Sequence, residues 1–300
     1  MTLVIDAHQH VWDLASARYD WLGPELAFID RDYDLDDALP SMDRAGVDAT
    51  ILVQAADNSE DTANMLAVAD RHPRVVGIVA WIPLEDPDAA APMLEVLRLD
   101  ERVVGIRNLI HDRPDRDWVL RPDVDAGLGV LEAAGVPFDY VTSSTAGLVH
   151  LPEISERHPE LRIVIDHLGK PPIGMPLDGT DDAARRQWRD VLTEAARNPL
   201  VSAKVSGLYR AHGAMYDWTP ELLRPFVEDA FEVFGADRLM WGSDWPVSEL
   251  GGGYDRVWDG LAAIFDTLTA PERVAVLGGT ATDFYRIDPG LLARAGKEMP

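Results

Sequence analysis

The sequence predicts an α/β protein folded as a (β/α)8 TIM barrel, a single domain over residues 1–300, and three observations support this prediction. Short apolar segments recur eight times, and the stretches between them are long enough for a returning helix. Strands that alternate with helices of about 10–15 residues form parallel βαβ units. A chain of 300 residues with 47% hydrophobic residues suits one barrel, a fold that commonly takes about 250 residues or more.

The predicted strands are short, apolar and rich in β-branched residues. They lie at residues 3–5, 47–55, 74–82, 102–110, 136–143, 162–169, 200–208 and 237–245. An open, doubly wound sheet is the alternative arrangement of the same units. No GxGxxG or GxxxxGK[ST] run opens any of the predicted helices, so the strongest reason for preferring a nucleotide-binding sheet is missing.

Capping signals place a helix between successive strands. The predicted helices are 35–45 (ended by Gly46), 58–71 (begun by Asn58), 93–99, 119–134 (ended by Gly135), 145–157, 181–197 and 220–234, with one or two more at the C-terminus. The polar, aromatic and turn-rich segment 12–33 is predicted to be a long loop.

Composition excludes several function classes. The net charge of −25 disfavours nucleic acid and anionic membrane surfaces as partners, because both require basic side chains. The chain has no cysteine, so any metal must be held by His, Asp or Glu. Neither a signal peptide nor an apolar run of the ~20 residues that span a bilayer is evident. We therefore expect a cytoplasmic protein; its oligomeric state is not encoded in any visible pattern.

The first strand runs into the motif DAHQH, which carries His8 and His10. Side chains at i and i+2 of a strand point to the same face, so the two imidazoles are expected side by side. A frayed strand end with two polar residues is the alternative explanation. If the pair is functional, it clamps a metal ion or handles protons.

Active sites of such barrels lie at the C-terminal ends of the strands. Two further candidates occupy such ends: His167 after the sixth strand and Asp244 after the eighth. Facing the histidine pair, Asp244 can accept the proton of an attacking water and hold a metal; as an alternative, it caps the next helix.

Substrate-binding candidates lie on the same face of the barrel. Arg107 and Lys204 interrupt apolar strands, and isolated buried charges are costly, so each needs either a structural aspartate or an anionic or carbonyl oxygen of the substrate. Asp139 ends the fifth strand. The loop aromatics Trp12 and Tyr209 suit stacking on a sugar or closing a lid, unless they only pack loops.

Five motifs in order over nearly the whole chain resemble the amidohydrolase superfamily. They are DAHQHVWD, VVGIRNLI, RIVIDHLGKPPI, KVSGL and DRLMWGSDWPV. The resemblance is greatest to the lactonase branch called amidohydrolase 2, which includes fuconolactonases and other sugar lactonases, sulfomuconolactonase and pyrone-dicarboxylate lactonase. It implies a (β/α)8 barrel that hydrolyses a ring ester.

Carried over to this sequence, the family's catalytic positions fall on His8, His10, His167 and Asp244. Dinuclear members carry a bridging lysine or glutamate on strand four and a histidine on strand five, where this chain has Arg107 and Asp139. The resemblance therefore implies at most one divalent ion, held by His8, His10 and Asp244. Such a set suits zinc, and a metal-independent mechanism stays open.

The sequence as a whole predicts a hydrolase that opens a small lactone, most simply a sugar aldonolactone. Asp244 is expected to be the general base, with His8 and His10 orienting the water. His167, Arg107 or Lys204 is expected to stabilise the oxyanion. The alternatives are a metal-dependent decarboxylase of a small unsaturated or aromatic acid, and a non-catalytic sugar-binding barrel.

Overall fold

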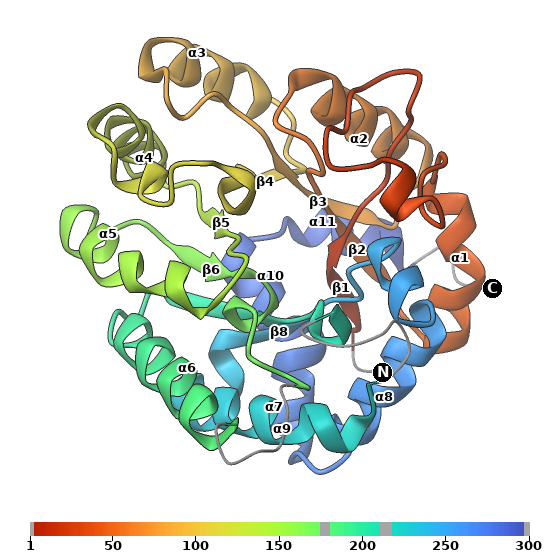
Figure 1. Ribbon diagram of the computed structural model, residues 1–300. Coiled ribbons are helices and arrows are strands. Elements are labelled where there is room, and N and C mark those ends of the chain that lie inside the picture. Colours follow the sequence, from red (N-terminus) through yellow and green to blue (C-terminus); the bar gives the residue numbers. More distant parts are fainter. Residues whose placement is uncertain (1–2, 175–180, 211–217, 297–300) are drawn as a thin grey trace.

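The strands close into a barrel, as the computed structural model of residues 3–174, 181–210 and 218–296 shows. Eight parallel strands follow one another in chain order, and the helices surround them (Figure 1). The ring closes just beyond β1 and β8. There the His10 amide donates to the Trp245 carbonyl (2.7 Å) and the Asp244 amide to the His8 carbonyl (2.8 Å). The predicted (β/α)8 barrel is confirmed.

The strands are shorter than the apolar runs that predicted them, and every strand residue is buried. They are β1 (Ile5–Gln9), β2 (Ala49–Val53), β3 (Val75–Ala80), β4 (Val103–Arg107), β5 (Phe138–Tyr140), β6 (Ile163–Ile165), β7 (Val201–Val205) and β8 (Leu239–Trp241). The first strand begins later than predicted and contains His8, and its register against β2 shifts between Asp6 and Gln9.

Most helices lie where the capping signals placed them. They are α1 (Leu35–Ala45), α2 (Ser59–Arg71), α3 (Pro87–Leu97), α4 (Pro122–Ala134), α5 (Leu151–Arg157), α6 (Asp181–Ala196), α7 (Pro220–Phe234), α8 (Tyr254–Phe265), α9 (Ala270–Val274), α10 (Thr280–Tyr285) and α11 (Pro289–Ala295). Gly46 and Gly135 end α1 and α4 in the left-handed conformation (φ 67° and 65°), which glycine adopts without a steric cost.

Three helix predictions need correction. Helix α3 starts earlier than predicted, because the Asp86 side chain accepts from the Ala89 amide and so caps its first turn. The predicted helix 145–157 is divided into a 3₁₀ segment (Thr145–His150) and α5. The C-terminal part holds α8 to α11, with a π-helical turn between α9 and α10, rather than one or two helices.

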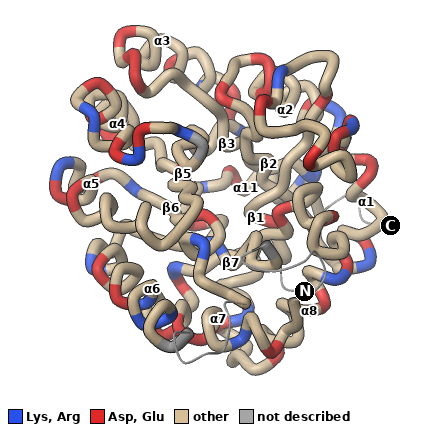
Figure 2. The backbone as a smooth tube through the Cα atoms, viewed as in Figure 1, with Lys and Arg blue, Asp and Glu red and all other residues tan. Residues whose placement is uncertain are grey.

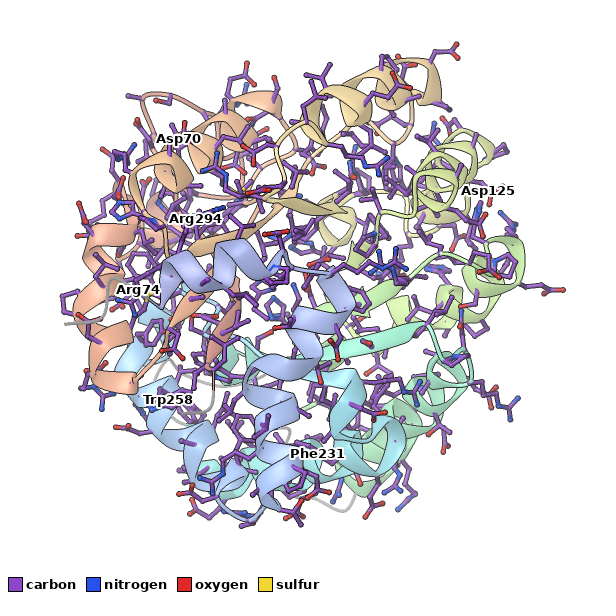
Figure 3. The ribbon with its side chains drawn as sticks, turned by 180° about the vertical axis from the view of Figure 1, so that it is seen from behind. Asp70, Arg74, Asp125, Phe231, Trp258 and Arg294 are labelled. Atoms are coloured by element: carbon purple, nitrogen blue, oxygen red, sulfur yellow. The ribbon has the colours of Figure 1, made fainter. Side chains whose placement is uncertain are left out.

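The apolar core has two layers. One lies between the strands and the surrounding helices. The other fills the barrel and continues into α10 and α11 through Phe284, Tyr285 and Leu291. Seen from behind, these last helices cross the end of the barrel where the strands begin (Figure 3). The barrel is therefore sealed at its N-terminal end, and access to its interior is from the C-terminal ends of the strands.

Acidic residues are spread over the outer helices on all sides (Figure 2). No helix in the described part of the chain is long and apolar enough to cross a membrane.

Helix α4 provides a test of the outer packing layer. A Cβ at Gly127 would overlap the Leu84 carbonyl oxygen and lie 2.9 Å from its carbonyl carbon, so the helix and the segment after β3 meet backbone to backbone. We expect Gly127→Ala to lower the free energy of unfolding by about 1–3 kcal/mol, measured by urea denaturation. Gly129 of the same helix, whose Cβ would have only an ordinary contact at 3.7 Å, is the control. Gly129→Ala should be neutral or stabilising, and equal effects of the two would contradict this packing.

Candidate active site

Four predicted residues converge at the C-terminal end of the barrel. The Nε2 atoms of His8 and His10 are 3.2 Å apart. Asp244 Oδ1 lies 3.4 Å from His10 Nε2 and 3.7 Å from His8 Nε2. His167 Nε2 is 3.9 Å from the same oxygen. The residues are therefore one cluster, and all four are at most 5% exposed.

The turn after β8 delivers Asp244 to this cluster. Asp244 has a left-handed backbone (φ 56°), a conformation that is uncommon for a non-glycine residue. Two contacts hold the turn against β1: the Ser243 amide donates to Asp6 Oδ1 (2.8 Å) and the Asp244 amide donates to the His8 carbonyl. A Cβ at Gly242 would lie 2.5 Å from the His8 Cβ, so only glycine permits this approach.

Hydrogen bonds on the far side of each ring orient the two first-strand histidines. His10 Nδ1 lies 2.6 Å from the Val53 carbonyl, which can only accept, so Nδ1 carries the proton. His8 Nδ1 lies between two charged groups, 3.2 Å from Asp166 Oδ1 and 3.1 Å from the Lys204 ammonium. Burial lowers the pKa of His8 to about 3 and also lowers that of His10. Both rings are therefore neutral, and His10 presents its Nε2 lone pair toward Asp244.

A buried charge network lies behind His8. The Lys204 ammonium is 2.5 Å from Asp139 Oδ2, 3.2 Å from Asp166 Oδ1 and 3.1 Å from His8 Nδ1. The Tyr285 hydroxyl donates to Asp139 (2.8 Å). Burial raises the pKa of Asp139 to about 6, against the opposing effect of Lys204. At Asp166 burial also acts upward, but Lys204 and His8 outweigh it and hold the pKa well below its usual range.

Arg107 completes this network on the pocket side. Its Nη1 donates to Asp166 Oδ2 (3.0 Å) and lies 3.4 Å from His8 Nε2, while Nη2 donates to the Gln54 carbonyl. The guanidinium is therefore held rigidly beside the reactive face of His8, with a structural aspartate as its partner. Since Arg107 also lines the pocket, it is placed to meet a substrate oxygen.

Two predicted substrate-binding residues, Lys204 and Asp139, are fully buried at 0% exposure. Neither residue is among those that line the pocket; both are engaged in the network beneath His8, and their predicted contact with substrate stays a prediction. Trp12 is 1% exposed and its Nε1 donates to the Arg31 carbonyl (2.6 Å), a placement that favours the alternative of loop packing. Tyr209 donates to Asp244 Oδ2 (2.6 Å) and orients that carboxylate instead.

A pocket of about 270 Å³ opens above the cluster. Its polar side is formed by His10, Arg107, His167 and Asp244, and its apolar side includes Trp21, Leu26, Ala55 and Val247. Sequence reasoning did not select Trp21 and Leu26, which come from the long loop 12–33. It also did not select His111 and Lys170, which line the same pocket.

The donor set fits a single divalent cation. One ligand atom each from His8, His10 and Asp244 can be chosen so that all lie within 4.8 Å of one another. His10 presents an Nε2 lone pair, and Nε2 of His8 lies 3.4 Å from Arg107 Nη1, which can only donate. Burial acts to raise the pKa of Asp244, but His167 and the other two histidines outweigh it and hold the carboxylate ionised, with a pKa well below its usual range. Two imidazoles and one carboxylate are a ligand set that zinc takes when a position is left open for water or substrate.

The network predicts a large stability effect at Lys204. We expect Lys204→Met to lower the free energy of unfolding by about 3–5 kcal/mol, because it leaves Asp139 and Asp166 buried without their cation. Urea denaturation measures it. Arg294→Met is the control, since it removes a pair of similar length (2.7 Å to Glu101) that is more than half exposed and should cost about 1 kcal/mol or less. Adding Asp139→Asn to Lys204→Met should recover part of the loss, and equal losses for the two single variants would contradict a buried network.

Comparison with known proteins agrees with this geometry. Residues 5–287 match the amidohydrolase family. The chain is 38% identical to an L-fucono-1,5-lactonase of Burkholderia ambifaria, over 96% of this chain and 97% of that protein. It is 35% identical to an L-fucono-1,5-lactonase of Burkholderia multivorans, over 95% and 96% of the two chains.

A crystal structure of a Burkholderia multivorans amidohydrolase with bound zinc is also similar. It superposes with a TM-score of 0.85 at 31% identity, over 95% of this chain and all of that one. Similarity of this extent, in sequence and in structure, shows that the chain belongs to the amidohydrolase family.

Proposed function

We propose that this protein is a lactonase that hydrolyses a sugar aldonolactone, with Asp244 as the general base. One observation carries the proposal: a buried, ionised carboxylate with three imidazole nitrogens 3.4–3.9 Å from one of its oxygens, at the floor of a pocket. That arrangement can hold and activate one water molecule. The similarity to L-fucono-1,5-lactonases supports a cyclic sugar ester as the molecule that the water attacks.

In the proposed reaction Asp244 takes a proton from the water as its oxygen attacks the lactone carbonyl carbon. The tetrahedral intermediate then collapses, the ring C–O bond breaks, and Asp244 returns the proton to the leaving alkoxide. Tyr209 holds Asp244 Oδ2, which leaves Oδ1 to face the water. The second hydrogen of the water can be accepted by the Nε2 lone pair of His10, and His8 lies beside it, with the two Nε2 atoms 3.2 Å apart.

Negative charge develops on the former carbonyl oxygen during this attack, and fixed donors stabilise it. Arg107 provides a guanidinium that Asp166 and the Gln54 carbonyl hold in place. His167 is positioned by a hydrogen bond between its Nδ1 and the Ser206 hydroxyl (2.9 Å). Lys204, the third candidate from the sequence, is too deeply buried for this role.

The pocket supports a compact, amphipathic substrate. Its volume of about 270 Å³ suits a molecule the size of a single sugar. The polar side meets the ring ester, and the apolar side formed by Trp21, Leu26 and Val247 suits the carbon skeleton or a deoxy position.

A divalent cation, if bound, would be held by His8, His10 and Asp244. It would supply Lewis-acid activation of the water and of the carbonyl. The residues described above provide binding, orientation and proton transfer with or without it.

Proton release in weak buffer tests the proposed function. Each lactone that is opened yields a carboxylic acid, which is ionised at neutral pH and therefore releases one proton. The panel should contain 1,4- and 1,5-lactones of hexonic and 6-deoxyhexonic acids, and a pyrone dicarboxylate. We expect turnover of the sugar lactones. If no lactone reacts while a small aromatic acid releases CO2, the protein is a decarboxylase; sugar binding without turnover would indicate a binding protein.

Asp244→Asn tests the assignment of the base. We expect kcat for the best lactone to fall by about 10²–10⁴-fold, the contribution usual for general acid–base catalysis, with the melting temperature little changed. Tyr209→Phe, which keeps the ring and removes only the hydrogen bond to Asp244 Oδ2, should give a smaller decrease. Near-normal turnover by Asp244→Asn would eliminate Asp244 as the base.

Metal removal tests what the histidines hold. The Arg107 guanidinium lies 3.4 Å from His8 Nε2, and its positive charge weakens the binding of a cation there. We therefore expect a chelator to remove the ion. Turnover should then decrease and return with added zinc, and His10→Ala should bind no zinc by elemental analysis. Full turnover by protein shown to be metal-free would mean that these residues act without an ion.

A further inference from the structure

The chain uses lysine very sparingly. Of its 27 basic residues only Lys170, Lys204 and Lys297 are lysines, and the other 24 are arginines. Lys297 lies outside the described residues. The remaining two are both at the catalytic end of the barrel: Lys204 is buried under His8, and Lys170 lines the pocket. Lysine differs from arginine in carrying a compact point charge with three donors, so its use at these two places indicates a specific requirement.

Lys170 is placed by an unusual backbone turn. Residues 167–170 all have positive φ: His167 56°, Leu168 51°, Gly169 68° and Lys170 56°. Three of them are not glycine, and a left-handed conformation costs such residues about 1–2 kcal/mol each. Strained backbone of this kind persists where the surrounding structure enforces it, and it is frequent at active sites.

The surroundings of the turn are tightly fixed. A Cβ at Gly169 would lie 2.6 Å from both δ-carbons of Leu148, so this position is closed to any larger residue. The Leu168 carbonyl accepts from the Trp188 indole (2.8 Å), and the Lys170 amide donates to the His167 carbonyl (2.9 Å). The turn is therefore a rigid mount for the two side chains at its ends.

Those two side chains, His167 and Lys170, both line the catalytic pocket. Burial holds the pKa of His167 well below its usual range, and the charge of Lys170 is the next cause. His167 in turn lies 3.9 Å from Asp244 Oδ1, so Lys170 shares one pocket with the groups that surround this carboxylate. The turn presents both side chains, His167 and Lys170, to one pocket.

We propose that Lys170 is a further catalytic residue, whose ammonium group binds the lactone carbonyl oxygen as that oxygen becomes negatively charged and then binds the product carboxylate. This inference rests on the proposed lactonase function. Attack of water converts the carbonyl oxygen into an oxyanion. Breaking of the ring C–O bond re-forms a carbonyl within a carboxylic acid, which releases the second water proton to solvent and becomes the carboxylate. The ammonium keeps its protons throughout; it provides charge, while Asp244 transfers the proton.

Arg107 and Lys170 then have different tasks. Arg107 is committed to Asp166, the Gln54 carbonyl and the face of His8, so it stays fixed at the pocket floor. Lys170 is half-buried on the loop after β6 and lines the pocket with a compact ammonium charge, so it presents a second positive charge from the loop side of the pocket.

Lys170→Met and Lys170→Arg provide the test, measured on the best lactone substrate with the corresponding aldonate as inhibitor. For Lys170→Met we expect kcat/KM to fall by about 10²–10³-fold, as for loss of one oxyanion donor, and inhibition by the aldonate to weaken at least several-fold. Lys170→Arg keeps the charge and should retain more of both. Arg116→Met is the matched control, because it removes an exposed positive charge from a neighbouring pocket on the same face, and it should leave both values unchanged.

Chemical modification gives a second measurement that does not depend on folding of a variant. Acetylation of the wild-type protein, mapped by mass spectrometry, should remove activity in step with modification of Lys170, and aldonate should slow both. Full activity with Lys170 acetylated, or unchanged kcat/KM and aldonate inhibition in a folded Lys170→Met protein, would overturn the assignment. Those results differ from a failure of the proposed function, in which the wild-type protein opens no lactone at all.

Discussion

The pairing of two buried carboxylates with two buried cations beneath His8 is the constraint on which the active site depends. Charges in the dry interior of a barrel persist only when they are paired and hydrogen-bonded. Positive and negative side chains alternate along this network, with contacts of 2.5–3.2 Å from Arg107 through Asp166 and Lys204 to Asp139. Two cations and two carboxylates leave the network without net charge. Its product is a histidine held in place: Asp166 Oδ1 and the Lys204 ammonium lie 3.2 and 3.1 Å from Nδ1 of His8, and Nε2 faces His10 and Asp244.

The contacts that close the barrel also assemble the active site. The hydrogen bonds that join the ends of β1 and β8 involve His8, His10 and the residues beside Asp244. Tyr285, which supports Asp139, comes from α10 at the opposite end of the barrel. The C-terminal helices therefore do more than cover apolar surface: they supply a hydroxyl to the charge network that orients His8. A chain without these helices would lose part of its active-site support as well as part of its core.

The sequence was informative where a local rule decides the outcome. Gly46 and Gly135 ended helices because the left-handed C-cap favours glycine, and His8, His10, His167 and Asp244 converged because parallel strands share one catalytic end. How deeply a strand residue is buried in the barrel could not be predicted. Lys204 and Asp139 also lie in strands, but the layer of the barrel that their side chains enter depends on the register between neighbouring strands. Lys170 was overlooked for another reason. Its position depends on four consecutive positive φ angles, and of these residues only Gly169 signals such a conformation.

The charges of the pocket suit a reaction that turns a neutral substrate into an anion. The network under His8 is neutral as a whole, but Arg107 at one end of it faces the pocket, so the field there is set by Arg107 and the other groups that line it. Arg107 and Lys170 favour the oxyanion as it forms, while the ionised Asp244 and a chain with a net charge of −25 oppose a carboxylate that stays. A pocket with more cations would bind the product as strongly as the transition state and would be slow to release it. The combination of a few fixed cations with an acidic chain therefore favours charge development during the reaction and departure of the product after it.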